Sequence, residues 1–122
     1  IVPYNFYRAI IYADESMLEI VWNNLLSNAL KFTEYGGTVK MIQTSDFDTT
    51  TVTVEDSGCG MNKEIMNHIF DRFYQGDTSR SQEGNGLGLA LSKKAIELVS
   101  GSISVKSTPG VGTTFIVQLK VA

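Results

Sequence analysis

The chain has 122 residues, of which 43% are hydrophobic and 19% charged, a size that allows one domain with a single buried core. A formal net charge of −3 argues against sequence-independent nucleic-acid binding, which needs a basic patch. No apolar run reaches the roughly 20 residues of a membrane-spanning helix, so we expect no direct membrane contact from this domain. Cys59 is the one cysteine and cannot form an internal disulfide, which favours a reducing, cytoplasmic location.

The first third of the chain predicts a strand followed by a long helix. An apolar segment over residues 4–12 is typical of a strand. Asp14 then offers an N-cap for a helix that runs to about Thr33, and Gly36 and Gly37 end it. Apolar residues repeat at helical spacing along one face of this helix, namely Leu18, Val21, Trp22, Leu25, Leu26 and Ala29.

The middle of the chain predicts a strand hairpin and a second helix. Two strands, over about residues 38–44 and 50–55, are joined by a polar turn at 45–48. A glycine-containing loop over residues 56–61 leads into a helix that begins near Asn62. The apolar stripe of this second helix consists of Ile65, Met66, Ile69, Phe70 and Phe73.

The last third predicts a loop, a third helix and two strands. Residues 76–86 lack hydrophobic periodicity and indicate a mobile loop, and a helix follows over about residues 87–100 with Gly101 as its left-handed terminator. Alternating apolar residues mark the two strands, Ile103 and Val105 in one, and Phe115, Val117, Leu119 and Val121 in the other. The order of elements predicts a single α+β domain of two layers, with three helices on one face of a mixed, mostly antiparallel five-stranded sheet.

A polar seam borders the apolar face of the first helix. Asn24, Asn28 and Lys31 stand at positions i, i+4 and i+7, which lie on one side of a helix. Such a seam is either a solvated edge or a site for phosphate and metal. An amide oxygen is a hard, neutral ligand for Mg²⁺, and a lysine one turn further on can meet phosphate charge.

Two glycine-containing segments could also bind a ligand. Asp56, Gly58 and Gly60 follow a strand, where a carboxylate can accept a hydrogen bond from an exocyclic amine and the glycines let the backbone approach a flat ring, although a plain turn has the same pattern. Residues 84–89 run into a helix N-terminus, which attracts anions. This segment is neither a Walker A loop nor a dinucleotide fingerprint, because no Gly-Lys-Ser/Thr follows and no strand precedes it.

Five motifs in this order resemble the ATP-binding catalytic domain of sensor histidine kinases, within the superfamily that includes gyrase, Hsp90 and MutL. Residues 24–33 are similar to the N box, 56–60 to the G1 box and 69–73 to the F box; 84–89 are similar to the G2 box and 110–115 to the final Gly-Thr motif. The resemblance extends from about Tyr4 to Val121 and implies the Bergerat-type ATP-binding fold.

The resemblance implies roles for the seam of the first helix, with ATP and Mg²⁺ as cofactors. Asn28 would ligate the Mg²⁺ ion that bridges the ATP phosphates, with Asn24 beside it. Lys31 would contact phosphate, and Phe32 would supply an aromatic ring against the nucleotide. Asn24 and Lys31 are the implied catalytic residues.

The other motifs complete the implied nucleotide site. Asp56 would accept from the adenine amino group, supported by Gly58, Gly60, Met61 and, more distantly, Thr113. The G2 backbone would wrap the phosphates, with contacts from Gly84, Gly86, Leu87, Gly88 and Leu89. Residues 74–85 would form an ATP lid, and we expect Phe70 and Phe73 to anchor the core beneath it.

Position 24 indicates the type of reaction. ATPases of the superfamily place a glutamate there to activate water, whereas the neutral amide of Asn24 cannot take a proton. We therefore expect a protein-histidine kinase, because positioning and electrostatic stabilisation suffice for phosphoryl transfer. A hydrolytic ATPase of the same superfamily and a non-catalytic nucleotide- or partner-binding module are the alternatives.

The acceptor of the phosphoryl group is expected on another domain. His68 is the one histidine, and we interpret it as a surface or lid-packing residue because it lacks the surroundings of an acceptor histidine. The expected partners are an upstream dimerisation and phospho-acceptor helical domain and the receiver domain of a response regulator. The resemblance further implies a homodimeric parent in the bacterial cell membrane, with this domain in the cytoplasm.

Overall fold

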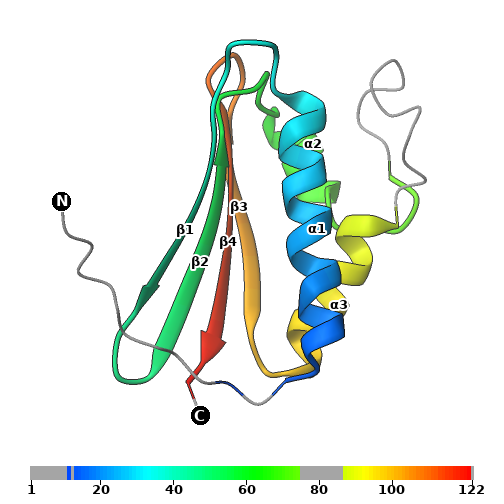
Figure 1. Ribbon diagram of the computed structural model, residues 1–122. Helices are drawn as coiled ribbons and strands as arrows, with labels where there is room; N and C mark the ends of the chain where they lie inside the picture. The colour runs from blue at the N-terminus through cyan, green and yellow to red at the C-terminus, as the bar shows by residue number, and fades with distance from the viewer. Residues whose placement is uncertain (1–10, 12, 75–86, 122) are drawn as a thin grey trace, which may run out of the picture.

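A computed structural model of the protein describes residue 11, residues 13–74 and residues 87–121. The helices of this part lie together on one side of the sheet (Figure 1), so the predicted two-layer α+β arrangement is confirmed. The elements in chain order are α1 (Glu15–Phe32), β1 (Val39–Ser45), β2 (Thr49–Asp56), α2 (Lys63–His68), α3 (Gly88–Leu98), β3 (Ser102–Thr108) and β4 (Gly112–Lys120).

The sheet has the strand order β1-β2-β4-β3, and every neighbouring pair is antiparallel. Short connections within the β1–β2 and β3–β4 hairpins reverse the chain and give antiparallel neighbours. The sequence predicted a mixed sheet of five strands. The described residues form four strands and no parallel pair, so the prediction was more specific than they support. The predicted strand over residues 4–12 lies outside the described residues except for Ile11, so a fifth strand stays a prediction.

Alternation along the central strands β2 and β4 builds the core. Val52 and Val54 face the helices from β2, and Phe115 and Val117 face them from β4, while the residues between them are more exposed. The buried apolar residues of the core are Val21, Leu25, Ala29, Val52, Val54, Ala95, Ile96, Phe115, Val117 and Leu119. Asp56, the polar residue at the end of β2, therefore lies at the edge of this apolar core.

Helix α1 begins as predicted and ends before the two glycines. The Oδ1 atom of Asp14 accepts from Ser16 N at 2.9 Å, which caps the first turn. The helix ends at Phe32 because Thr33 has extended backbone, while its hydroxyl donates to Ala29 O at 2.6 Å. Gly36 and Gly37 thus belong to the turn that follows the helix.

The β1–β2 turn confirms the predicted polar connection. The Oδ1 atom of Asp46 accepts from Thr49 N at 2.8 Å and from Asp48 N at 2.9 Å. These two N–H groups favour the ionised carboxylate and lower the pKa of Asp46 below its ordinary value. The side chain therefore closes the hairpin as an Asx turn.

The second helix is shorter than its apolar pattern indicates. Asn62 caps it through Oδ1, which accepts from Ile65 N at 2.8 Å, but α2 ends at His68. Tight turns replace the last part of the predicted helix, and His68 Nδ1 lies 2.8 Å from Asp71 Oδ2 within them. Phe73 has a φ of 62° and is 67% exposed, so its predicted place in the core is wrong.

The other aromatic residue of the predicted stripe does reach the core. The ring of Phe70 packs edge-on against the ring of Phe115, with centroids 6.0 Å apart. Positive φ at Phe73 turns the chain away from the direction that a continuous helix would take. The apolar pattern therefore placed Phe70 in the core correctly and Phe73 wrongly.

The end of α3 corrects the predicted role of Gly101. Ser100, with a φ of 60°, is the left-handed residue, and its N–H donates to Glu97 O at 3.0 Å. Gly101 N donates to Ile96 O at 2.9 Å, which completes a Schellman motif. A glycine is nonetheless required at position 101, because a Cβ atom would lie 2.6 Å from Gln118 O.

Candidate functional site

Asp56, the last residue of β2, carries a nearly buried carboxylate. Its exposed fraction is 6%, and its Oδ1 atom accepts from Gly58 N at 2.8 Å. The Oδ2 atom has no hydrogen-bond partner among the described residues. A buried carboxylate oxygen costs free energy unless it accepts hydrogen bonds, so this atom is available to a donor from a ligand or from water.

The loop after Asp56 passes close to backbone on both sides. A Cβ atom on Gly58 would overlap Phe32 O at the end of α1, and one on Gly60, which has a φ of 71°, would overlap Thr108 O. Contacts within the protein therefore account for both glycines, independently of any flat ring. The loop after Asp56 therefore packs against the end of α1 at Gly58 and against the β3–β4 hairpin at Gly60.

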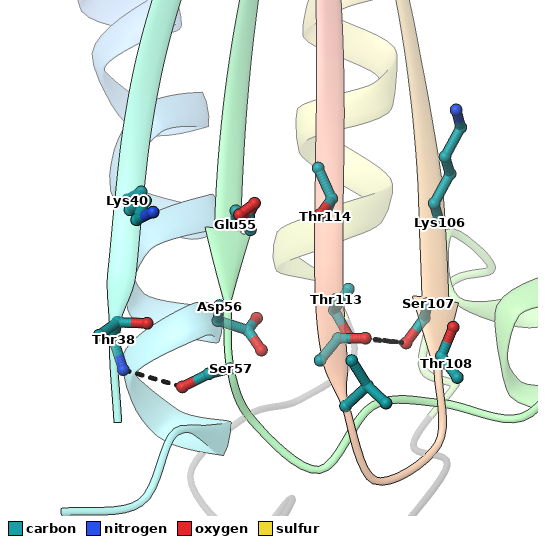
Figure 2. A pocket seen from close by; sticks show the side chains of 12 residues that line it. Thr38, Lys40, Glu55, Asp56, Ser57, Lys106, Ser107, Thr108, Thr113 and Thr114 are labelled. Atoms are coloured by element: carbon teal, nitrogen blue, oxygen red, sulfur yellow. Dashed lines mark hydrogen bonds between the residues drawn. The ribbon is translucent and has the colours of Figure 1, made fainter. Parts of the chain in front are cut away.

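A serine connects three segments around Asp56. Thr113 pairs directly with Asp56 across β2 and β4. Ser107 Oγ accepts from Met61 N at 2.7 Å and donates to Gly112 O at 2.9 Å. Because this proton is already used, the hydroxyl of Thr113 is the donor in its 2.8 Å hydrogen bond to Ser107 (Figure 2), which leaves the lone pairs of Thr113 as acceptors.

The polar seam of α1 is half-buried and is not a solvated edge. Asn24, Asn28, Lys31 and Phe32 are all intermediate in exposure. The Nζ atom of Lys31 lies 5.4 Å from the centroid of the Phe32 ring, and the amide of Asn28 has no hydrogen bond to another described residue. A half-buried amide without such a partner is available to bind a ligand.

Asn24 connects the seam to the N-terminus of α3. Its Nδ2 atom donates to Gly88 O at 3.1 Å and to Ser92 Oγ at 3.2 Å. Leu87 is the N-cap residue of α3 and has an apolar side chain that cannot cap the helix. A Cβ atom on Gly88 would lie 3.5 Å from Asn24 Oδ1, which is ordinary contact, so packing against Asn24 alone does not require glycine there.

The remaining predicted residues divide into two groups. Met61 and Leu89 pack against the core with partly buried side chains. Gly84 and Gly86 lie outside the described residues, as does the predicted lid after Tyr74. The structure thus brings Asp56, Gly58 and Thr113 together at one end of α1, and Asn24 together with Gly88 at its middle.

A cavity of about 370 Å³ opens on the sheet face that the helices leave uncovered. Figure 2 shows Lys40, Glu55, Thr114 and Lys106 in front of the strands, with the helices behind them. Asp56 and Thr113 also line this cavity, but the seam of α1 does not. The cavity therefore shares Asp56 and Thr113 with the predicted site but does not include the residues of α1.

A metal ion in this site would have to take most of its donor atoms from a bound phosphate and from water. No group of three His, Cys, Asp or Glu side chains that could hold a metal occurs among the described residues. The free amide of Asn28 could supply one neutral oxygen, and the oxygens of a bound phosphate would have to supply others. This donor set fits Mg²⁺, which usually keeps several waters and binds with substrate phosphates.

Comparison with known proteins places this arrangement in a family. Residues 13–122 match the family model described as "Histidine kinase-, DNA gyrase B-, and HSP90-like ATPase". The chain belongs to this family. The heme sensor protein HssS of Staphylococcus saprophyticus is 39% identical over 107 residues, which cover 88% of this chain and 23% of HssS.

Solved structures of histidine kinases share the fold of this ATPase-family chain. The mycobacterial sensor histidine kinase MprB superposes with a TM-score of 0.83 at 28% identity, covering 91% of this chain and 76% of that one. Full-length ShkA in complex with AMPPNP superposes with a TM-score of 0.79 at 29% identity, covering 94% and 24%. The resemblance found in the sequence is thus confirmed at the level of the family and its fold.

Three serines of this family member were missed by the sequence analysis. Ser57 Oγ accepts from Thr38 N at 2.8 Å and joins the loop to the chain before β1. Ser107 and Ser92 have the roles described above. Ser57 and Ser107 resemble ordinary solvated residues in the sequence, whereas a polar residue at the buried face of a helix, as at Ser92, is a usable signal.

Proposed function

We propose that the chain binds Mg²⁺-ATP between Asp56 and the seam of α1 and donates the γ-phosphoryl group to a histidine on a separate helical domain. The observation that carries this proposal is the free Oδ2 atom of the buried Asp56 carboxylate, which can accept from the amino group of adenine. The family match supports it, and so does the AMPPNP complex of the similar protein ShkA.

Each residue of the site has a role that its chemistry permits. Asp56 selects adenine, with the acceptor of Thr113 beside it, and Lys31 attracts phosphate. Asn28 would hold the magnesium ion, which when bound neutralises charge on the phosphates. The amide of Asn24 orients without acting as a base, so water is not activated and the nucleophile comes from outside the chain.

The proposal also covers the longer protein to which this domain would belong. The chain spans 23% of the length of HssS, so the activity of a whole kinase is inferred from its relatives. We propose an upstream dimerisation and phospho-acceptor domain, a response-regulator receiver domain as the next acceptor, and a homodimeric parent in the bacterial cell membrane. Among the described residues, no helix has both the length and the apolarity needed to cross a membrane.

Two measurements test the proposed function. Calorimetric titration with a non-hydrolysable ATP analogue and Mg²⁺ should give saturable binding at one site. Labelled ATP should then transfer phosphate to a separately prepared dimer of acceptor helices, with little release of free phosphate. Binding without transfer would favour a non-catalytic module, and rapid phosphate release from the chain alone would favour a hydrolytic ATPase.

Asn28→Ala should weaken nucleotide binding mainly when magnesium is present. We expect a loss of about tenfold or more with Mg²⁺, since even outer-shell partners of a metal contribute about 10- to 100-fold. Affinity in EDTA should change little, because the adenine contacts remain. Asn23→Ala is the matched control, since Asn23 is exposed on the same helix. Equal losses with and without Mg²⁺ would contradict the ligand role of Asn28.

A further inference from the structure

A closed hydrogen-bond network joins α1 to the first turns of α3. The Nδ2 atom of Asn24 donates to Gly88 O at 3.1 Å and to Ser92 Oγ at 3.2 Å, and Ser92 Oγ donates to Gly88 O at 2.9 Å. Ser92 is fully buried, with an exposed fraction of 0%. The proposed nucleotide site does not itself require this serine.

Counting protons fixes the orientation of the Asn24 amide. A carbonyl oxygen only accepts, so the atom that faces Gly88 O must be the nitrogen. The single proton of Ser92 is used on Gly88 O, which leaves its lone pairs to accept from Asn24. Nδ2 of Asn24 thereby donates to both acceptors, and Oδ1 has no partner among the described residues.

The free oxygen of Asn24 lies at the N-terminal turn of α3. A Cβ atom built on Gly88 would lie 3.5 Å from Asn24 Oδ1, which places this oxygen next to the helix entry. An N-terminal helix turn attracts phosphate, and Asn28 follows one turn later on α1. A rotated amide would present its NH₂ group there instead, and such a group cannot bind a cation.

We propose that Ser92 is a positioning residue that holds the Asn24 amide with Oδ1 directed at the magnesium-bound phosphates. This inference rests on the proposed function, because it assigns an atom to the metal side of that site. Without the Ser92 hydroxyl, Nδ2 of Asn24 keeps only one of its two acceptors, the carbonyl of Gly88. The amide is then held by the Gly88 carbonyl alone, so its Oδ1 atom is less firmly oriented towards the phosphates.

Two substitutions of equal shape separate the hydroxyl of Ser92 from its packing. Ser92→Thr and Ser92→Val add the same bulk at a buried position, but threonine alone keeps a hydroxyl that can bond the carbonyl four residues earlier. Ser92→Ala removes the hydroxyl without adding atoms. Thermal unfolding of each variant reports the packing cost, which the threonine and valine variants share.

Two readouts test the proposal. Without ligand, nuclear magnetic resonance measures hydrogen exchange of the Asn24 side-chain amide, which should be slow in the unchanged chain and in Ser92→Thr and faster in the valine and alanine variants. With an ATP analogue, the ratio of affinity with Mg²⁺ to affinity in EDTA should fall about tenfold in Ser92→Val and Ser92→Ala but not in Ser92→Thr.

The outcomes separate this inference from the proposed function. If Ser92→Thr and Ser92→Val give the same exchange rate or the same affinity ratio, the positioning role is overturned. An unchanged ratio in Ser92→Val, with binding intact, would overturn the inference alone. Absence of nucleotide binding in the unchanged chain would remove the proposed function and, with it, the inference.

Discussion

Asp56→Asn should reduce the affinity for ATP about 10- to 100-fold, because a hydrogen bond to a charged group is worth about 1.5–3 kcal/mol. Gly58 N donates to one oxygen of Asp56 at 2.8 Å and would keep an oxygen at that position in the variant. The amide nitrogen would then take the place of Oδ2. A donor would face the donor of the adenine amino group, and the contact would become repulsive.

Glu55→Gln is the matched control for this prediction. Glu55 precedes Asp56 on β2 and is exposed on the opposite face of the sheet (Figure 2), so the same chemical change there should leave ATP affinity within about twofold, as is usual for surface substitutions. Calorimetry measures both affinities, and thermal unfolding without ligand excludes misfolding as the cause. Similar affinities in the two variants would contradict the adenine-binding role of Asp56.

Phe115→Ala should lower the free energy of unfolding by about 3–5 kcal/mol. Phe115 is 1% exposed, faces the helices from β4 and contacts the ring of Phe70, so its removal leaves a cavity in the centre of the core. We expect the unfolding midpoint to fall by about 10–25 °C. Calorimetry or circular dichroism on heating measures the change.

Phe47→Ala supplies the same substitution at the surface. Phe47 is 95% exposed in the β1–β2 turn, and its loss should change the free energy of unfolding by no more than about 0.5 kcal/mol. A comparable destabilisation by the two variants would contradict the placement of Phe115 at the centre of the core.

The sequence predicted those parts of the fold that depend on local chemistry. Asp14 capped α1 as expected, and the alternating residues Phe115, Val117 and Leu119 marked the strand β4, in which all three are buried. Asp56 was identifiable because a carboxylate followed by glycines stood at a strand end. In each case neighbouring residues in the chain determine the structure, so periodicity and capping rules are sufficient.

Other features depend on segments that are distant in the sequence. Gly101 is required by Gln118 O on a neighbouring strand, and Gly58 by Phe32 O at the end of α1. Ser92 acts on a side chain 68 positions away. Phe73 was misplaced because a continued apolar stripe does not show that turns have replaced the helix. These contacts join residues that are far apart in the sequence. No local sequence pattern predicts them, so they could be found only in the folded chain.

The carbonyl of Gly88 also limits how the proposed chemistry of this domain could change during evolution. An acidic residue at position 24 could activate water, but its oxygen would meet the Gly88 oxygen, which now accepts from Asn24 at 3.1 Å. Two acceptors at that distance repel each other. A change at position 24 that favours ATP hydrolysis would therefore need a simultaneous rearrangement of α3. Single substitutions at this position should yield inactive proteins more often than hydrolases.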